Sequence, residues 1–447
     1  MLALPILFQN LATTLLGLVD TFMVGTLGQA PLAAVLVANI PVFVIQLVIF
    51  GFQSGSSVLI SQFWGKGDTD SINRVIGLGL YLAMAISAVF SLVMFLFPLP
   101  LMGALTDNQE LVPLAAEYAR IIGFSYLFNS MTGVYLGAQR AMENPKLGTI
   151  VFSCSMVVNI FLNWVLIFGN LGAPALGVAG AALATLLSRV LEFCITAGYA
   201  LFNRRFRLTA ALLRPGRALL AKFIRYSGPV VCNETLWGLG TSLYKVIFGH
   251  MDGSTEILAA RALAGNVEDL CTVAIFAVAG TTAIIVGREI GAGRKDTVYE
   301  VGGALNILAM LCALVIGILL LLCTWFLFPA TLYPMCRLSE TAGRYTTLML
   351  TFAGIFLALR AFCTVNIVGV LRGGGDVRAA TLIDLLPMWC VALPLAALIG
   401  LVLRLPLFWV YVGMESEQIL KFLGGVKRFR SRVWINDVTQ LAKGPEV

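Results

Sequence analysis

Long uninterrupted runs of apolar residues follow one another along the chain, with only short polar stretches between them. A helix needs about 20 apolar residues to cross the hydrocarbon core of a bilayer. Strands of a membrane β-barrel are about 10 residues long and alternate in polarity, a pattern that these runs lack. The pattern therefore predicts an all-α polytopic membrane protein with twelve transmembrane helices, at residues 2–26, 33–62, 75–102, 112–139, 147–169, 175–202, 219–248, 257–286, 301–328, 342–372, 379–401 and 405–424.

The composition agrees with this prediction. Of the 447 residues, 59% are hydrophobic and only 12% are charged. Soluble globular proteins are about 45–50% apolar and about 25% charged, and disordered chains have low hydrophobicity. The composition therefore excludes most soluble and disordered classes of protein.

The net charge of +7 would suggest a nucleic-acid partner in a soluble protein. Here most Lys and Arg residues fall in the predicted loops and tail that share a side with the N-terminus. Basic loops face the cytoplasm in membrane proteins. We therefore predict a multi-pass protein of the inner or plasma membrane with both termini cytoplasmic, and no nucleic-acid partner.

The residues that support metal or redox chemistry are scarce. The nine cysteines show no CxxC spacing, and His250 is the one histidine. A membrane enzyme that handles phosphate or prenyl groups needs clustered carboxylates or a His/Cys constellation, and the sequence contains neither. We expect no enzymatic activity and no cofactor.

A basic loop near the middle of the chain divides it into two sets of six spans. We predict an N-terminal lobe at residues 1–202, a cytoplasmic linker at 203–218, a C-terminal lobe at 219–424 and a basic cytoplasmic tail at 425–447. The tail contains Lys427-Arg-Phe-Arg-Ser-Arg432, a run typical of segments that bind anionic lipid headgroups.

Paired motifs indicate that the two lobes are repeats. Gly65-Lys-Gly follows the second span and Gly291-Ala-Gly the eighth, while Gly137-Ala-Gln-Arg140 ends the fourth span and Gly369-Val-Leu-Arg372 the tenth. Six spans return the chain to the same side of the membrane, so the repeat is parallel. Such repeats place a binding site near the midplane at the interface of the halves, which indicates a transporter.

Polar residues inside predicted spans are costly and are therefore candidates for function. Asp20 lies well inside the first span. Asn159 and Asn163 are four residues apart and face one side of the fifth span. A carboxylate and amide oxygens suit a hard cation, while hydrogen bonding between helices is the alternative role for the asparagines.

Other charged residues within spans need partners. Arg189 and Glu192 are three residues apart on one helix and are expected to pair. Arg360 has three candidate partners, which are Glu234, Asp384 and Glu268.

Seven stretches along the chain together resemble a known family. They are Leu4-Pro5 to Asn10, Val19-Asp20 to Gly25, Gln139 to Pro145, Val158-Asn159 to Asn163, Gly177 to Ala182, Asn233-Glu234 to Gly238 and Gly369 to Asp376. They resemble the multidrug and toxic compound extrusion (MATE) family, a branch of the multidrug/oligosaccharidyl-lipid/polysaccharide flippase superfamily. The resemblance covers nearly the whole chain and is of the bacterial type. It implies a V-shaped pair of six-helix lobes and the export of varied cationic or amphipathic compounds, driven by Na⁺ or H⁺.

The resemblance also implies roles for individual residues. Asp20 and Asn159 match an aspartate and an asparagine that the family uses for cation or proton coupling, and Asn163 stands where an acid is often found. Thr185 is the nearest candidate for a threonine of the sixth helix. Glu234 matches an acid of the seventh helix, although the tenth helix carries Arg360 and lacks the partner acid. Asp20, Asn159 and Asn163 are thus candidate Na⁺ ligands, and Glu234 is either a coupling residue or half of a structural ion pair.

We therefore predict a monomeric secondary active multidrug efflux antiporter that exchanges drug-like small molecules for H⁺ or Na⁺ by alternating access. The alternative is a lipid-linked oligosaccharide or polysaccharide flippase of the same superfamily. Relatives of that kind often have 14 spans and a strongly cationic central cavity. Twelve spans with only Arg189, Lys245 and Arg360 assigned to their interiors disfavour it.

Overall fold

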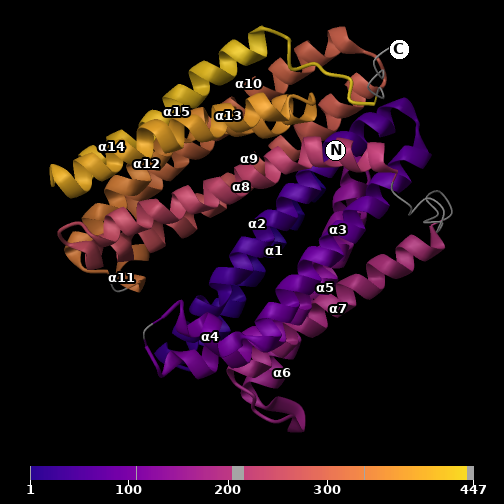
Figure 1. Cartoon of the computed structure of the whole chain (residues 1–447). Coiled ribbons are helices and arrows are strands. Elements are labelled where there is room, and N and C mark those ends of the chain that lie inside the picture. The colour runs from indigo at the N-terminus through magenta and orange to yellow at the C-terminus, as the bar shows by residue number, and fades with distance from the viewer. Residues whose placement is uncertain (1, 107, 204–215, 337, 440–447) are drawn as a thin grey trace. The chain divides into compact units, whose positions relative to one another are not determined.

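The computed structural model describes residues 2–106, 108–203, 216–336 and 338–439, which form helices, turns and bends without a strand. The chain divides into two compact units, residues 1–231 and 232–447. Most of the predicted linker, residues 204–215, lies outside the described residues, as do residues 440–447 of the tail (Figure 1). The two units are described separately below.

The first unit is built from seven helices and the start of an eighth. They are α1 (Ala3–Gly25), α2 (Gln29–Lys66), α3 (Thr69–Leu96), α4 (Pro98–Gly103), α5 (Leu111–Ala141), α6 (Lys146–Phe168) and α7 (Val178–Phe202), with a 3₁₀ turn η1 (Asn170–Gly172) after α6. Helix α8 (Arg217–Gly249) begins in the first unit and ends in the second.

The second unit continues with long helices that contain several wider π-type turns. They are α9 (Ser254–Gly291), α10 (Lys295–Leu322) with η2 (Cys323–Leu327), α11 (Leu332–Met335), α12 (Glu340–Thr364) with η3 (Val365–Leu371), α13 (Val377–Pro387), η4 (Met388–Ala392), α14 (Leu393–Ala397), η5 (Leu398–Val402) and α15 (Leu407–Arg430).

Each of the twelve predicted spans coincides with a long helical segment, so the all-α prediction is confirmed. Within the described residues, ten segments are long and apolar enough to cross a membrane. Helices α8 and α15 are not among these ten, and both carry several charged residues, which in α15 include Glu415, Glu417 and Lys421 in the middle of the helix. Some of those charges take part in the polar networks described below.

One helix lies at the centre of each unit. In the first unit α5 packs against α2, α3 and α7, which are the second, third and sixth spans. In the second unit α12 packs against α9, α10 and α15, which are the eighth, ninth and twelfth spans. The packing therefore repeats in the way that the paired glycine motifs predict.

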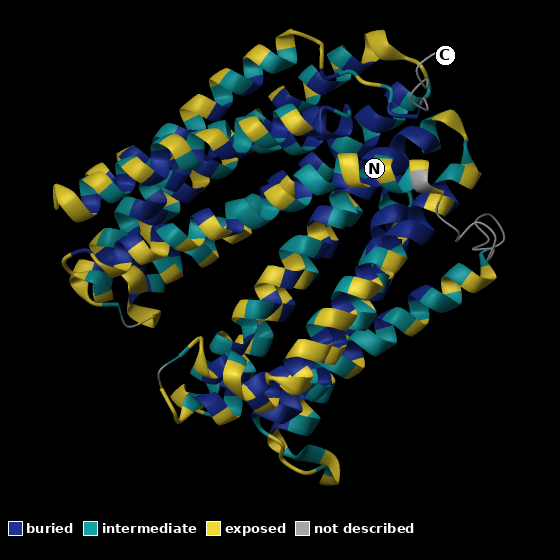
Figure 2. Ribbon diagram, viewed as in Figure 1, coloured by how far each residue is buried: buried dark blue, intermediate teal, exposed yellow. Residues whose placement is uncertain are grey.

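Apolar side chains also cover the outer faces of the helices. Phe22, Val89, Val157 and Ile355 are each more than 60% exposed within their units. Exposed residues alternate with buried ones along most helices (Figure 2). Water would disfavour so much exposed apolar surface, whereas lipid chains accommodate it.

The segment after α15 packs onto the second unit. Trp434 is fully buried and its indole nitrogen donates to the carbonyl of Phe429. Arg428 pairs with Asp376 at 2.6 Å, and the guanidinium of Arg432 lies 4.2 Å from the ring centroid of Tyr299. Two arginines of the basic run that we expected to bind lipid headgroups thus make contacts within the protein.

The close approach of α10 and α12 depends on glycine. A Cβ atom added at Gly317 would lie 2.6 Å from the carbonyl oxygen of Gly354, whereas one added at Gly265 of α9 would meet nothing within 4 Å. Gly317→Ala therefore forces the helices apart, and we expect it to destabilise the protein by about 1–3 kcal/mol. Gly265→Ala should be neutral or stabilise slightly because alanine favours a helix. Unfolding midpoints of the two variants in detergent check this, and equal midpoints would contradict it.

Candidate functional site

A small polar cluster joins α1 to α6 inside the first unit. The Asn163 amide nitrogen donates to Asp20 Oδ1 at 2.6 Å and to Asn159 Oδ1 at 2.9 Å. Both asparagines are only 1% exposed. The structure thus brings together the carboxylate and the two amides that the sequence singles out.

Local helix geometry explains this arrangement. The spacing of four residues places Asn159 and Asn163 on one face of α6, and that face packs against α1. Arg189 of α7 and Tyr118 of α5 lie close enough to Asp20 to interact electrostatically with it. Thr185, on the described part of α7, makes no hydrogen bond to these residues.

The cluster contains donor and acceptor atoms that are not satisfied. Asn163 Oδ1 and Asn159 Nδ2 are buried without a hydrogen-bond partner. A half-turn of the Asn163 amide exchanges its nitrogen and oxygen atoms and directs Oδ1 toward the oxygens of Asp20 and Asn159. Three oxygens would then converge, and oxygen ligands are what a hard cation such as Na⁺ prefers. The residues present therefore fit a monovalent cation.

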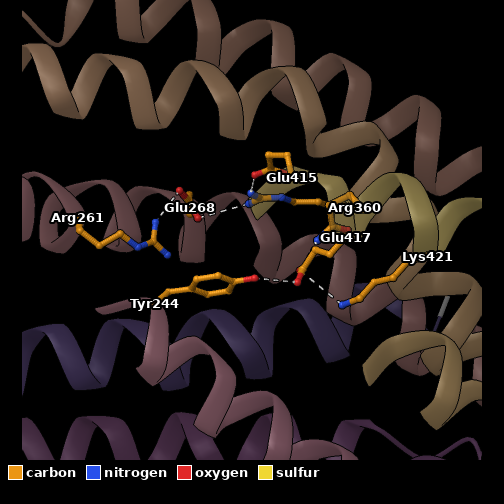
Figure 3. A network of polar contacts seen from close by, with 8 residues as sticks. Tyr244, Arg261, Glu268, Arg360, Glu415, Glu417 and Lys421 are labelled. Atoms are coloured by element: carbon orange, nitrogen blue, oxygen red, sulfur yellow. Dashed lines mark hydrogen bonds and ion pairs between the residues drawn. The ribbon is translucent and has the colours of Figure 1, made fainter. Parts of the chain in front are cut away.

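A larger charged network occupies the second unit (Figure 3). Arg360 of α12 contacts Glu415 of α15 closely and Glu268 of α9 at 3.5 Å. Glu268 also pairs with Arg261 at 2.9 Å. Arg360 thus has Glu268, one of its three candidate partners, and additionally Glu415, which the sequence analysis did not consider.

The network continues along α15 toward α13 and α8. Lys421 lies 2.8 Å from Asp384 and 3.6 Å from Glu417. The Asn233 amide donates to Asp384 at 2.8 Å, and the Tyr244 hydroxyl donates to Glu417 at 3.3 Å. Asp384 therefore has a lysine as its ion-pair partner instead of Arg360.

Glu234 also has a partner other than Arg360. Its carboxylate accepts from Arg372 at 2.7 Å, and the Arg372 side chain is 1% exposed. Arg372 directly follows η3, where the tenth span ends, and was treated in the sequence only as a residue of the repeated motif. This contact places Glu234 in a buried ion pair, and its role in coupling stays a prediction.

The remaining charged candidates divide into paired and exposed residues. Arg189 donates to Glu192 at 2.7 Å, as their spacing predicts. Lys245, which the sequence assigns to the interior of a span, is exposed. The sequence analysis missed Glu415, Glu417 and Lys421, although all three lie within the predicted twelfth span, where any charged residue is a signal of function.

Comparison with known proteins identifies the family. A family model described as MatE matches residues 5–165 and 229–398, well over half of the chain. The chain belongs to the MATE family of membrane transporters. The probable multidrug resistance protein NorM of Thermotoga maritima is 27% identical to it over 440 residues, which cover 97% of this chain and 92% of that protein.

Solved structures show the same fold. A transporter of Pyrococcus furiosus from the superfamily, described as having a binding pocket of reverse polarity that suggests a different function, aligns with a TM-score of 0.86 at 21% identity. The alignment covers 96% of this chain and 95% of the Pyrococcus furiosus chain. An outward-facing multidrug resistance MATE transporter aligns with a TM-score of 0.85 at 22% identity and covers the same shares. These likenesses establish the MATE fold, and the function rests on other evidence.

The buried pair of Glu234 and Arg372 yields a stability test. Glu234→Leu leaves the buried guanidinium without its partner, and we expect a loss of about 3–5 kcal/mol. Replacing both residues, as Glu234→Leu with Arg372→Met, should recover most of this loss because no buried charge remains. Unfolding midpoints in detergent measure both variants.

The exposed pair of Glu340 and Arg344 provides the matched control, since its side chains are 83% and 78% exposed. Glu340→Leu should leave the midpoint nearly unchanged. A double variant at Glu234 and Arg372 that is less stable than the single variant would show that the pair does not act as a unit.

Proposed function

We propose that this protein is a secondary active multidrug efflux antiporter, a monomer that exports cationic or amphipathic compounds in exchange for H⁺ or Na⁺. The observation that carries the proposal is the cluster of Asp20, Asn159 and Asn163. A related MATE protein carries the name of a probable multidrug resistance protein, which supports drug-like molecules as the substrate class.

The cluster suits ion coupling because Asp20 accepts its hydrogen bond from a neutral amide, that of Asn163. When Asp20 is ionised, Asn163 donates to it. When Asp20 gains a proton, its O–H group donates a hydrogen bond to Oδ1 of the rotated Asn163 amide, an oxygen that has no other partner. The same rotation supplies an oxygen to Na⁺. The site can therefore hold Asp20 either ionised or bound to a cation, and these two forms differ by one positive charge.

Coupling follows when each state favours a different conformation of the transporter. A ligand shifts a conformational equilibrium only by its differential affinity for the two conformations. In an antiporter the coupling cation and the drug favour opposite conformations, so that entry of one drives exit of the other. The substrate site then opens alternately to each side of the membrane.

Asp20→Asn tests the proposal directly. The variant keeps the shape of the side chain but cannot change its charge, so we expect it to abolish gradient-driven export of a fluorescent organic cation. The measurement uses proteoliposomes with an imposed H⁺ or Na⁺ gradient, one at a time.

Asp70→Asn serves as the matched control, because Asp70 is an exposed acid in the first turn of α3. It should transport like the original protein. Undiminished coupled export by the Asp20→Asn variant would refute the role of the cluster.

The distribution of basic residues supports cytoplasmic termini. We therefore expect green fluorescent protein fused after Val447 to fluoresce in bacterial cells, because that reporter folds in the cytoplasm. Alkaline phosphatase fused at the same point should be inactive. The opposite pair of results would reverse the orientation.

A further inference from the structure

The charged network of the second unit contains more acids than bases. Glu268, Glu415, Glu417 and Asp384 share contacts with Arg261, Arg360 and Lys421 among the described residues. The nearby pair of Glu234 and Arg372 is balanced and does not change this difference. If every group were ionised, the network would carry one uncompensated negative charge.

A second observation assigns the uncompensated negative charge to Glu415. This residue is 3% exposed, and its Oε2 atom is buried without any hydrogen-bond partner. Its other oxygen accepts from Arg360. The hydroxyl of Tyr411, one turn earlier on α15, is also buried and unpartnered.

The other three acids have more complete sets of partners. Asp384 accepts from Lys421 and Asn233, and both of its oxygens are engaged. Glu417 accepts from Tyr244 and Gln418. Glu268 contacts Arg261 and Arg360 through different oxygens. Glu415 is thus the member of the network whose ionised form is least satisfied.

A buried ionised oxygen without a donor is costly, and the cost disappears when the oxygen is protonated. We propose that Glu415 is a second proton-binding site of this transporter, in addition to Asp20. A proton from water forms an O–H bond at Oε2 and returns to water when Glu415 ionises. The role of this proton in transport rests on the proposed antiport function.

The surroundings favour a proton over Na⁺ at this position. The guanidinium of Arg360 occupies the first oxygen of Glu415, so only Oε2 is free, and a single oxygen is enough to bind a proton. A metal ion also needs several oxygen ligands. The titratable and charged groups that interact with Glu415 come from four helices: Tyr244 of α8, Glu268 of α9, Arg360 of α12, and Tyr411 and Glu417 of α15.

Protonation of Glu415 would affect more than one helix. Arg360 is shared between Glu415 and Glu268, so neutralising Glu415 leaves the guanidinium to Glu268 alone. The contact between α12 and α15 then weakens relative to the contact between α12 and α9. Gain or loss of this proton therefore changes the balance of attractions among three helices of the unit.

Infrared difference spectroscopy of the full chain in detergent tests the site. A pH step should produce the carbonyl band of a protonated carboxyl group, and Glu415→Gln should remove one component of that band. Glu415→Asp keeps a carboxyl group and should shift the component instead, which preserves the test if the glutamine variant does not fold. Glu340→Gln, at an exposed acid of α12, should leave the band unchanged.

Proton release on addition of a fluorescent organic cation provides the functional measurement. We expect Glu415→Gln and Asp20→Asn each to lose part of the release, and the double variant to lose all of it. An unchanged infrared band and unchanged release in Glu415→Gln would overturn the Glu415 site and leave the Asp20 proposal standing. If the unmodified protein exports no drug under either gradient, the antiport proposal fails, and the infrared band still decides whether Glu415 binds a proton.

Discussion

The hydrocarbon core of a membrane offers no hydrogen-bond partners, so every polar group within it must be satisfied by the protein itself. The backbone meets this requirement by forming helices at all twelve predicted spans. Side chains meet it by pairing across helices, as Asn163 does with Asp20. A buried polar atom without a hydrogen-bond partner is therefore informative. The free-energy cost of burying it must be offset by a bound ligand, a proton or a conformational change.

The two units share a packing plan but differ in their polar residues. Pro5 and Gln9 of α1 are matched at the same spacing by Pro229 and Asn233 of α8. Gln9 donates to the start of α6, and Asn233 donates to Asp384 of α13, so both amides link the first helix of a lobe to the fifth. Tyr244 stands as far beyond Pro229 as Asp20 stands beyond Pro5. The acid of the first unit is therefore replaced by a phenol, and the second unit draws its acids from other helices.

The contrast between a shared packing plan and differing polar residues explains how much of the structure could be predicted from the sequence. The spans follow from the long apolar runs along the chain, and the contacts of Asn159 with Asn163 and of Arg189 with Glu192 follow from helical spacing. Contacts such as those of Glu234 with Arg372 join helices far apart in the chain. They depend on which faces meet after packing, and no local pattern encodes that choice.

Glu415 illustrates a different limit. A charged residue inside a predicted span signals function, so Glu415 was visible in the sequence. Its missing hydrogen bond was not, because an unpaired oxygen is defined only once all its neighbours are placed. The count of acids against bases in a network likewise needs the network to be known first.

The partner of an acid decides whether that acid can change its charge during transport. Asp20 accepts its hydrogen bond from the neutral amide of Asn163, so gaining a proton breaks no ion pair. Glu234 is held by a guanidinium that is almost fully buried, and its protonation would remove the one carboxylate in ion-pair contact with that cation, at a cost of several kcal/mol. Glu415 also contacts a guanidinium, but Arg360 has a second carboxylate in Glu268. The network around Glu415 contains one more acid than bases, so Glu415 can gain and lose a proton during transport. The balanced pair of Glu234 and Arg372 is instead suited to a structural role.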